Sequence, residues 1–519
     1  PVWQHDSGVG EGGSEVVQFD AGKLATTNGE NDSVDVLDAA DGSLLLSIDL
    51  TALEGYAGIQ SVDIKNGLIA AAIARAPVEM TIFGETTQVS QPGFVAIFDA
   101  ETGALISTAD VGVLPDMLTF TDDGLKILVA GEGEKNEDSD NDDDPLGTVG
   151  IVDLSDVTAP VATVLDFTAF NGFEDLARAD GVRIAPGVNF ALDMEPEYIA
   201  LSPDGSKAFV TLQENNAVAV LDIASMTITE VIGLGTRDFS APGNELDAND
   251  NGIIELNNFD DLVGLFMPDA IASYEVDGQT YFVTANEGDD RGFDSARVGS
   301  LLEDGLIDPS VDTTGLERLA VSTVDGDVDG DGDIDVLHAL NTRSFSIFAE
   351  DGTLVYDSGS LFETFIAANY PERFNDDDGE DGENRSDAKG PEPEAIEIGQ
   401  AYGKTFAFIG LERDSGVFVM DITDPADVSL VDYMPGFGNG NLAPEVIEFI
   451  PQDLSSTGFA QIAVSYEVTG TVAMFNLLPD EASIGQIQGA GHMSAFEGMT
   501  VKTTGIVTAV DSNGFYLQD

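Results

Sequence analysis

Short apolar runs separated by turn residues recur along most of this chain. The clearest example opens at residues 390–397 with a proline and an acid. It continues through a first and a second apolar run that ends in Glu412, and closes with a third run that ends in Asp421. Short runs rich in Val, Ile and Phe and bounded by Gly, Pro or Asp predict β-strands. The unit therefore predicts three consecutive strands, with acids at the start of the first and at the ends of the second and third.

Seven stretches of the chain share this order of a start signal, strands and terminal acids. They start at residues 14, 60, 115, 196, 268, 390 and 444, and the copy at residue 60 is the weakest. Repeats of short strands at this spacing indicate a solenoid or a propeller, and units of three or four strands with insertions favour a propeller. We therefore expect an all-β fold, with a β-propeller of about seven blades in residues 1–479. We assign residues 336–348 and 354–357 to a sixth blade, which lacks the proline and acid of the other starts.

The pattern changes near residue 480. Residues 498–510 and 514–519 alternate between apolar and polar positions around a turn, which predicts two paired strands. We interpret residues 480–519 as the start of a small β-barrel domain. The pattern stops midway, so we expect the natural protein to continue past Asp519.

The repeated acids predict a common site. In a propeller blade, the loop that enters the first strand and the turn between the second and third strands lie on one face. Two rings of acids are therefore expected around the channel mouth: Glu15, Asp116, Glu197, Asp269, Glu394 and Glu445 in the first, and Glu30, Glu132, Glu214, Glu287, Glu412 and Glu467 in the second. Carboxylates at such distances repel one another strongly, and Ca²⁺ is a hard cation that takes oxygen ligands.

Eight ring acids are the predicted metal ligands: Glu197, Glu214, Asp269, Glu287, Glu394, Glu412, Glu445 and Glu467. We expect several Ca²⁺ ions, with another divalent cation or iron as the alternative. The competing interpretation is that these acids cap strands or accept hydrogen bonds from amides at blade edges.

An Asp-rich loop is the sharpest local motif. Asp325, Asp327, Asp329, Asp331, Asp333 and Asp335 alternate with glycines and apolar residues. Such a loop can wrap one oxygen-ligated cation. The position of the final Glu in an EF-hand is taken by Val336 or His338, so the loop resembles those of thrombospondin or dockerin; a solvated turn is the alternative. Two acidic inserts, residues 132–144 and 375–383, are either metal-binding or solvated loops.

The composition of the chain limits the kinds of binding partner that the propeller can have. The chain has 96 acids and 19 bases, a formal net charge of −77, and no cysteine. This charge argues against nucleic acid or an anionic membrane as a partner of the propeller. No apolar run approaches the roughly 18 residues of a membrane span. An acidic surface of this kind is expected in high salt or seawater, or in a protein that binds many divalent cations, so we expect a protein of a marine or salt-tolerant bacterium.

With these residues in view, the chain resembles the choice-of-anchor I family of secreted bacterial proteins, which includes atypical cyanobacterial alkaline phosphatases and mesenchyme-specific cell-surface glycoproteins. The matching stretches are residues 196–205, 213–216, 285–289, 343–347, 386–394 and 407–413. They span about residues 10–477, and residues 389–394 are the most specific. The resemblance implies a phytase-like propeller, a secreted or surface location and, in some members, a phosphatase assignment. The tail resembles the oligonucleotide-binding-type barrel that precedes bacterial extracellular nucleases, which implies a nuclease beyond Asp519.

Two functions fit these features. The first is a Ca²⁺-dependent phosphoesterase, in which clustered cations bind a phosphate ester and activate water. Its candidate residues are Glu394, Glu412, Arg413, Lys389 and Arg291, with Arg343 and Arg385 as further phosphate ligands and Ser386 or Thr284 as a hydroxyl nucleophile. The second is a non-enzymatic surface, matrix or adhesion module that Ca²⁺ stabilises, in which the bases only neutralise the rings. Neither function fixes the oligomeric state.

Overall fold

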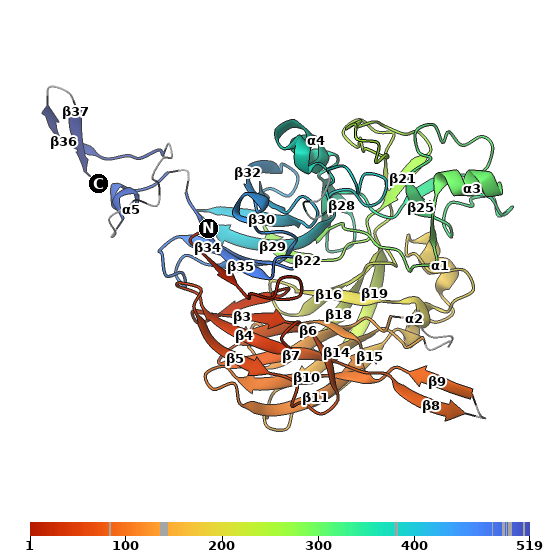
Figure 1. The fold of residues 1–519 in the computed structure, drawn as a ribbon, viewed down its shortest axis with the longest axis horizontal. Helices are drawn as coiled ribbons and strands as arrows, with labels where there is room; N and C mark the ends of the chain where they lie inside the picture. Colours follow the sequence, from red (N-terminus) through yellow and green to blue (C-terminus); the bar gives the residue numbers. More distant parts are fainter. Residues whose placement is uncertain are drawn as a thin grey trace.

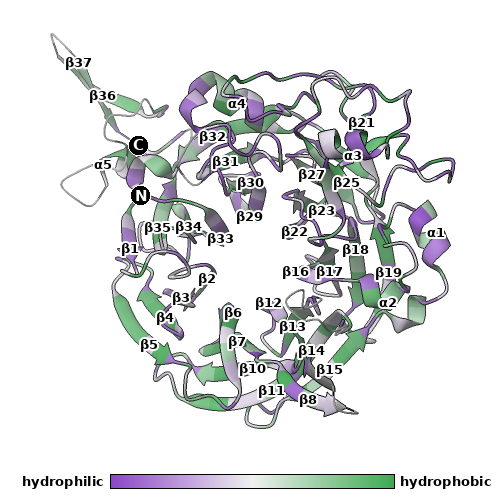
Figure 2. Ribbon diagram, turned by 45° about the vertical axis from the view of Figure 1, so that its right-hand side comes forward, coloured by the Kyte–Doolittle hydropathy of each residue, from purple (hydrophilic) through white to green (hydrophobic). Residues whose placement is uncertain are grey.

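The computed structural model describes residues 1–82, 85–134, 144–377, 379, 382–479, 481–489, 494, 496, 501–511 and 514–518. In this part of the chain, seven four-stranded antiparallel sheets surround a common centre (Figures 1 and 2). The predicted seven-bladed β-propeller is therefore confirmed. The innermost strand of each blade is the first strand of its repeat.

The first four blades follow one another along the chain. Blade 1 is β2 (Val17–Asp20), β3 (Lys23–Asn28), β4 (Ser33–Asp38) and β5 (Leu44–Asp49). Blade 2 is β6 (Tyr56–Lys65), β7 (Leu68–Arg75), β10 (Pro92–Asp99) and β11 (Leu105–Val113), with the hairpin β8 (Val78–Ile82) and β9 (Glu85–Val89) between its two halves. Blade 3 is β12 (Pro115–Phe120), β13 (Lys126–Gly131), β14 (Thr148–Asp153) and β15 (Val161–Asp166). Blade 4 is β16 (Pro196–Leu201), β17 (Lys207–Leu212), β18 (Ala217–Asp222) and β19 (Thr227–Gly233).

The last three blades contain the insertions and the closure. Blade 5 is β22 (Ile271–Val276), β23 (Gln279–Ala285), β27 (Phe345–Ala349) and β28 (Leu354–Asp357). Blade 6 is β29 (Pro393–Ala401), β30 (Lys404–Leu411), β31 (Gly416–Asp421) and β32 (Ser429–Pro435). Blade 7 is β33 (Pro444–Ile450), β34 (Ala460–Tyr466), β35 (Thr471–Leu477) and the N-terminal strand β1 (Trp3–Asp6).

Strand β1 closes the ring of blades. It pairs antiparallel with β35, with Trp3 opposite Met474. The indole Nε1 of Trp3 donates a hydrogen bond to the carbonyl oxygen of Ala39 in blade 1 at 3.0 Å. The first seven residues carry no start signal, so the sequence pattern did not reveal this strand.

The expected separate sixth blade at residues 336–348 and 354–357 is wrong. Strands β27 and β28 complete blade 5, because β27 pairs with β23 from Tyr281↔Ala349 to Ala285↔Phe345. The chain leaves the blade after β23 and returns at β27. This is why the outer half of blade 5 has no start signal of its own.

The segment that leaves blade 5 after β23 packs with an earlier segment that connects blade 4 to blade 5. Together the two segments form a lobe on one side of the propeller (Figure 1). Its elements are β20 (Thr236–Asp238), β21 (Leu262–Leu265), β24 (Ser295–Arg297), α3 (Val298–Asp304), β25 (Ala320–Ser322) and β26 (Leu337–Ala339). Leu262, Leu316 and Leu337 belong to its buried core. The remaining short helices lie in connections: η1 (Thr168–Phe170), α1 (Glu174–Ala179), α2 (Phe190–Asp193), α4 (Leu361–Asn369), η2 (Pro371–Arg373) and η3 (Phe437–Asn439).

Adjacent blades pack through apolar faces. Between blades 4 and 5, Phe282 stacks on Phe348 with ring centroids 5.3 Å apart and lies 5.4 Å from Phe209. All three rings are fully buried, and such aromatic contacts add to the stability that area burial alone provides. Buried aromatic packing of this kind therefore joins blade 4 to blade 5.

The tail consists of α5 (Ile484–Gln488) and a hairpin of β36 (Ile506–Asp511) and β37 (Gly514–Gln518), which projects from the propeller (Figure 1). Phe496 packs edge-on against Phe459 of the propeller at 5.6 Å. The barrel expected in residues 480–519 stays a prediction. Among the residues that the structure describes, no helix combines the length and apolar character that crossing a membrane requires.

Candidate metal centre

A proline and a β-bulge position the acids of the first ring. In blades 3, 4, 6 and 7 the first strand begins with a proline, and the register with the second strand shifts directly after it. Proline is tolerated at the first position of a strand, and a bulge redirects the side chain that it contains. The redirected residues are Asp116, Glu197, Glu394 and Glu445. Blade 2 shifts register at the same place and carries Gln60 there.

Backbone hydrogen bonds place the second set of acids beside the first. The amide of Glu412 donates to the carbonyl oxygen of Glu392 at 2.9 Å. The amides of Glu467 and Glu132 donate in the same way to the residues just before β33 and β12. In these three blades, the turn after the second strand is therefore tied to the entry of the first strand. Glu30 is exposed, in contrast to the other members of the set.

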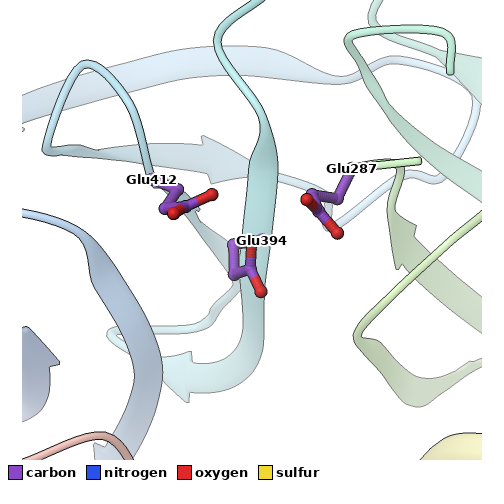
Figure 3. Close-up of side chains that lie close together, drawn as sticks. All are labelled: Glu287, Glu394 and Glu412. Carbon is purple, nitrogen blue, oxygen red and sulfur yellow. The ribbon is translucent and has the colours of Figure 1, made fainter. Parts of the chain in front are cut away.

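Three carboxylates from two blades form the tightest group. One oxygen each from Glu287, Glu394 and Glu412 lie within 4.8 Å of one another (Figure 3). Asp269 extends the group, because its carboxyl is close enough to those of Glu394 and Glu197 for both to lower its pKa. Next to them, a cavity of about 220 Å³ is lined by Gln60, Tyr198 and five acids: Glu15, Asp116, Asp269, Glu445 and Glu467. The structure thus brings together all eight ring acids predicted as metal ligands, since charge interactions also connect Glu197 with Glu214.

Burial raises the pKa values of these acids, and neighbouring carboxylates add to the effect. The pKa of Asp269 rises to about 8, first through burial and then through the charge of Glu287. The pKa of Glu15 rises to about 7 through burial, Glu467 and Asp116. The pKa values of Glu394 and Glu445 lie well above their usual range for the same reasons. Without cations, the ring therefore holds protons at neutral pH.

Several ring oxygens have no hydrogen-bond partner among the described residues. They are Oε2 of Glu197, Glu214 and Glu394, each buried. Buried polar atoms are almost always paired in native proteins. Together with the donor set, which consists of carboxylate oxygens, these atoms fit a site for hard divalent cations.

The candidate bases lie at the ring, and each is ion-paired. Lys389 contacts Glu287. Arg413 Nη2 lies 3.1 Å from Glu412 Oε1, and its Nε lies 3.0 Å from Glu392. Arg291 binds Glu195 at 3.1 Å and Asp193 at 3.3 Å, and Arg385 binds Glu392 at 2.7 Å. These contacts fit the interpretation that the bases neutralise the rings.

The other candidates for phosphate chemistry lie away from the ring surface. Arg343 is buried and pairs with Glu363 at 2.8 Å, so its guanidinium is used inside the protein. Ser386 and Thr284 are fully buried. A buried hydroxyl cannot reach a substrate, so these two residues are wrong as nucleophile candidates.

Sequence reasoning missed two carboxylates of the site, Glu195 and Glu392. Each is the first acid of a Glu-Pro-Glu tripeptide whose second acid is a ring residue, Glu197 or Glu394. In both cases the first acid binds the nearby arginines. The repeated tripeptide was the signal that could have found them.

The Asp-rich loop divides into two carboxylate groups. Oxygens of Asp327, Asp329 and Asp335 lie within 4.8 Å of one another, as do those of Asp308, Asp333 and Asp335. Asp308 comes from another segment, and nothing in the sequence pattern pointed to it.

Two other acids of the loop lie outside both groups. Asp325 points away, since its Oδ2 accepts hydrogen bonds from Arg183 at 2.7 Å and Ser322 at 2.6 Å. The expectation that Asp325 is a loop ligand is therefore wrong. Asp331 is exposed. Of the two acidic inserts, residues 135–143, 378, 380 and 381 lie outside the described residues.

Parts of this chain are similar in sequence to known proteins. Gigasin-3a of Magallana gigas is 30% identical over 186 residues, 31% of this chain and 64% of its own length. The mesenchyme-specific cell surface glycoprotein of Strongylocentrotus purpuratus is 25% identical over 377 residues, 61% of this chain and 46% of its own length. The chain thus spans less than two thirds of either relative. Among solved structures, hydrazine synthase of Kuenenia stuttgartiensis aligns with 90% of this chain and 96% of its own at 12% identity and a TM-score of 0.47.

The family comparison covers most of the propeller. The model of the choice-of-anchor I domain matches residues 15–425, which include blades 1 to 5 and most of blade 6. The predicted resemblance is therefore confirmed, and the chain belongs to the choice-of-anchor I domain family.

Proposed function

We propose that the carboxylate ring binds several divalent cations, Ca²⁺ first, and that this face hydrolyses phosphate esters outside the cell. The observation that carries the proposal is the group of Glu287, Glu394 and Glu412, whose oxygens lie within 4.8 Å in a largely buried setting. Three ionised carboxylates at this distance require a counter-charge. A divalent cation supplies it and uses their free lone pairs.

The donor set favours Ca²⁺ over transition metals. The ring offers carboxylate oxygens, and the chain has no cysteine. Hard cations such as Ca²⁺ and Mg²⁺ select such ligands, whereas softer metals select thiolate or imidazole. Ca²⁺ also tolerates six to eight ligands in irregular geometry, which suits predicted ligands that come from four neighbouring blades, blades 4 to 7.

Cations at this place could serve phosphate chemistry. A metal ion polarises a phosphoryl oxygen and lowers the pKa of a bound water, which then attacks phosphorus. The adjacent cavity of about 220 Å³ is smaller than the roughly 300–1,000 Å³ of pockets for drug-sized ligands, and so suits a phosphoryl group with a small ester. Cations at Glu287 and Glu412 would release Lys389 and Arg413 to bind the phosphoryl oxygens.

The second candidate is a surface module that Ca²⁺ stabilises without catalysis. Two observations favour it. The bases of the rim are already paired with carboxylates, and one relative carries the name of a cell surface glycoprotein. Both candidates place the protein outside the cell.

A hydrolysis assay separates the two candidates. We expect the protein to release p-nitrophenol from p-nitrophenyl phosphate with Ca²⁺ and to lose this activity in EGTA. Glu394→Gln should abolish it, whereas Glu275→Gln, an exposed acid elsewhere on the propeller, should not. Calcium binding at the ring without hydrolysis of phosphate esters would leave only the surface module, and no calcium binding would remove both.

A further inference from the structure

The ring contains a second cluster of carboxylates, in blades 3 and 4, that the group of Figure 3 does not include. Glu214 is 7% exposed, and its buried Oε2 has no hydrogen-bond partner among the described residues. Oε2 of Glu197 is also buried without a partner among the described residues. The pKa of Glu197 is raised by its burial first, and then by the charges of Glu214, Asp269 and Glu132. Two unpaired buried oxygens beside a third carboxylate form an incomplete polar group, which a ligand would complete.

The backbone brings these three residues together. Glu132 follows β13, Glu197 lies in the bulge of β16, and Glu214 follows β17. Blades 3 and 4 approach closely here because of Gly147. A Cβ at this position would lie 2.0 Å from the carbonyl oxygen of Met194 and 3.0 Å from that of Glu132. Only glycine permits this approach of Glu132 to the strand of Glu197.

Neighbouring contacts hold the second cluster in place and join it to the first. Arg183 Nη1 donates to the backbone oxygen of Glu214 at 3.1 Å. Gln213 Nε2 donates a hydrogen bond to Glu287 Oε2 at 2.8 Å. Of the two residues that follow β17, Gln213 therefore contacts the first cluster, and Glu214 belongs to the second. Asp269 is close enough to both Glu197 and Glu394 for their carboxyls to lower its pKa, and it therefore lies between the clusters.

We infer that Glu132, Glu197 and Glu214 form a second divalent-cation site, which Asp269 bridges to the site of Glu287, Glu394 and Glu412. This inference rests on the proposed function and deepens it. Two cations that share one carboxylate are the arrangement that stabilises both the attacking and the leaving oxygen in phosphoryl transfer. The ligand class of the pair is therefore a phosphate monoester or diester that spans both ions.

Anomalous diffraction from crystals of the whole chain grown with Mn²⁺ tests the second site. We expect two peaks at the rim of the wild-type protein, one beside Glu214 and one beside Glu412. Glu214→Gln should remove the first peak and keep the second, and Glu412→Gln should do the reverse. Asp269→Asn should lower the occupancy of both.

The outcomes separate this inference from the proposed function. A single wild-type peak beside Glu412 would overturn the second site and leave the proposed function intact. No peak at either place would overturn both. Equilibrium dialysis with ⁴⁵Ca²⁺ gives the same count in solution: Glu214→Gln should bind one ion fewer than wild type, and an unchanged count would contradict the inference even if a variant does not crystallise.

Discussion

Four carboxylates of the first ring, Asp116, Glu197, Glu394 and Glu445, owe their positions to the residue pair that opens their blades. Proline begins the strand, and the bulge after it turns the acid toward the channel mouth. Glu392 adds a second device, because its backbone lies in the left-handed region with φ 50°, a conformation that non-glycine residues adopt rarely. Its fully buried carboxylate forms ion pairs with Arg385, Arg413 and Lys389. A single strained residue thereby sets where three cationic groups lie.

Arg183 illustrates how a single buried residue supports the ring. Its side chain is 2% exposed and pairs with Asp294 and Asp325, each at 2.7 Å. We expect Arg183→Met to lower the free energy of unfolding by about 3 kcal/mol, since it leaves buried carboxylates without a partner. Lys207→Met, which removes an exposed pair with Glu350, should cost less than about 1 kcal/mol. Urea denaturation measures both, and equal losses would contradict the argument.

At the scale of elements, the propeller depends on contacts that join distant parts of the chain. Strand β1 completes blade 7, and Trp3 lies against buried residues of blades 7 and 1. The lobe likewise joins two excursions through the parallel pairing of β21 and β26. Local pattern predicts strands, whereas these pairings decide which blade a strand joins.

Trp3 tests the closure. We expect Trp3→Ala to lower the free energy of unfolding by about 2 kcal/mol, less than the 3–5 kcal/mol of a fully buried aromatic residue, because Trp3 is half-buried. The neighbouring Val2 is 43% exposed, and Val2→Ala should change stability by less than about 0.5 kcal/mol. Urea denaturation again gives the values. Similar effects of the two changes would mean that Trp3 does not secure the joint between blades.

The Asp-rich loop is the element whose cation binding is easiest to isolate. Asp333 belongs to one of its carboxylate groups and has a buried Oδ1 without a hydrogen-bond partner, whereas Asp331 lies outside both groups. Because calcium affinity depends on ligand number and charge, we expect Asp333→Asn to weaken terbium binding at the loop roughly tenfold and Asp331→Asn to weaken it much less. Luminescence titration measures both. Equal losses would indicate a diffuse acidic surface instead of a site.

The sequence predicted the repeating elements and the ring better than their connections. The proline, the acid and the apolar runs are local, so seven blades and residues such as Glu197 and Glu394 could be placed without a structure. A local pattern does not contain pairing between distant segments. Such pairing determines where strand β1, the outer half of blade 5 and Asp308 lie. Asp325 fits the loop motif and was misassigned, because its partner Arg183 lies far away in the sequence.

At the scale of the whole molecule, the carboxylate ring brings together side chains from several blades around the centre of the propeller. The group of Glu287, Glu394 and Glu412 spans blades 5 and 6, and the acids of the adjacent cavity extend around the centre to blades 1, 3 and 7. Any cation bound there cross-links several blades. In a chain with a net charge of −77, such cations also remove repulsion that opposes the compact state.

The pH dependence of stability tests the ring as a unit. The folded pKa values of Asp116, Glu15 and Asp269, about 6, 7 and 8, lie above the roughly 4 of unfolded Asp and Glu. In EGTA the native state then binds more protons than the unfolded state between about pH 4 and 8, so stability should fall as pH rises through this window. We expect the melting temperature in EGTA to be highest near pH 5 and lowest near pH 8.

Calcium should cancel this loss, because cations replace the protons as the counter-charge of the carboxylates. At a hundred times its Kd, each ion bound only by the native state adds about 2.7 kcal/mol. The melting temperature at pH 8 should therefore rise sharply with Ca²⁺, while at pH 5, where protons compete for the same oxygens, the rise should be small. The triple variant with Gln at positions 287, 394 and 412 is the matched control, and its response to Ca²⁺ at pH 8 should be weaker. Calorimetry at both pH values measures these shifts, and a stability in EGTA that increases from pH 5 to 8 would show that the ring does not carry its carboxylates in the protonated form.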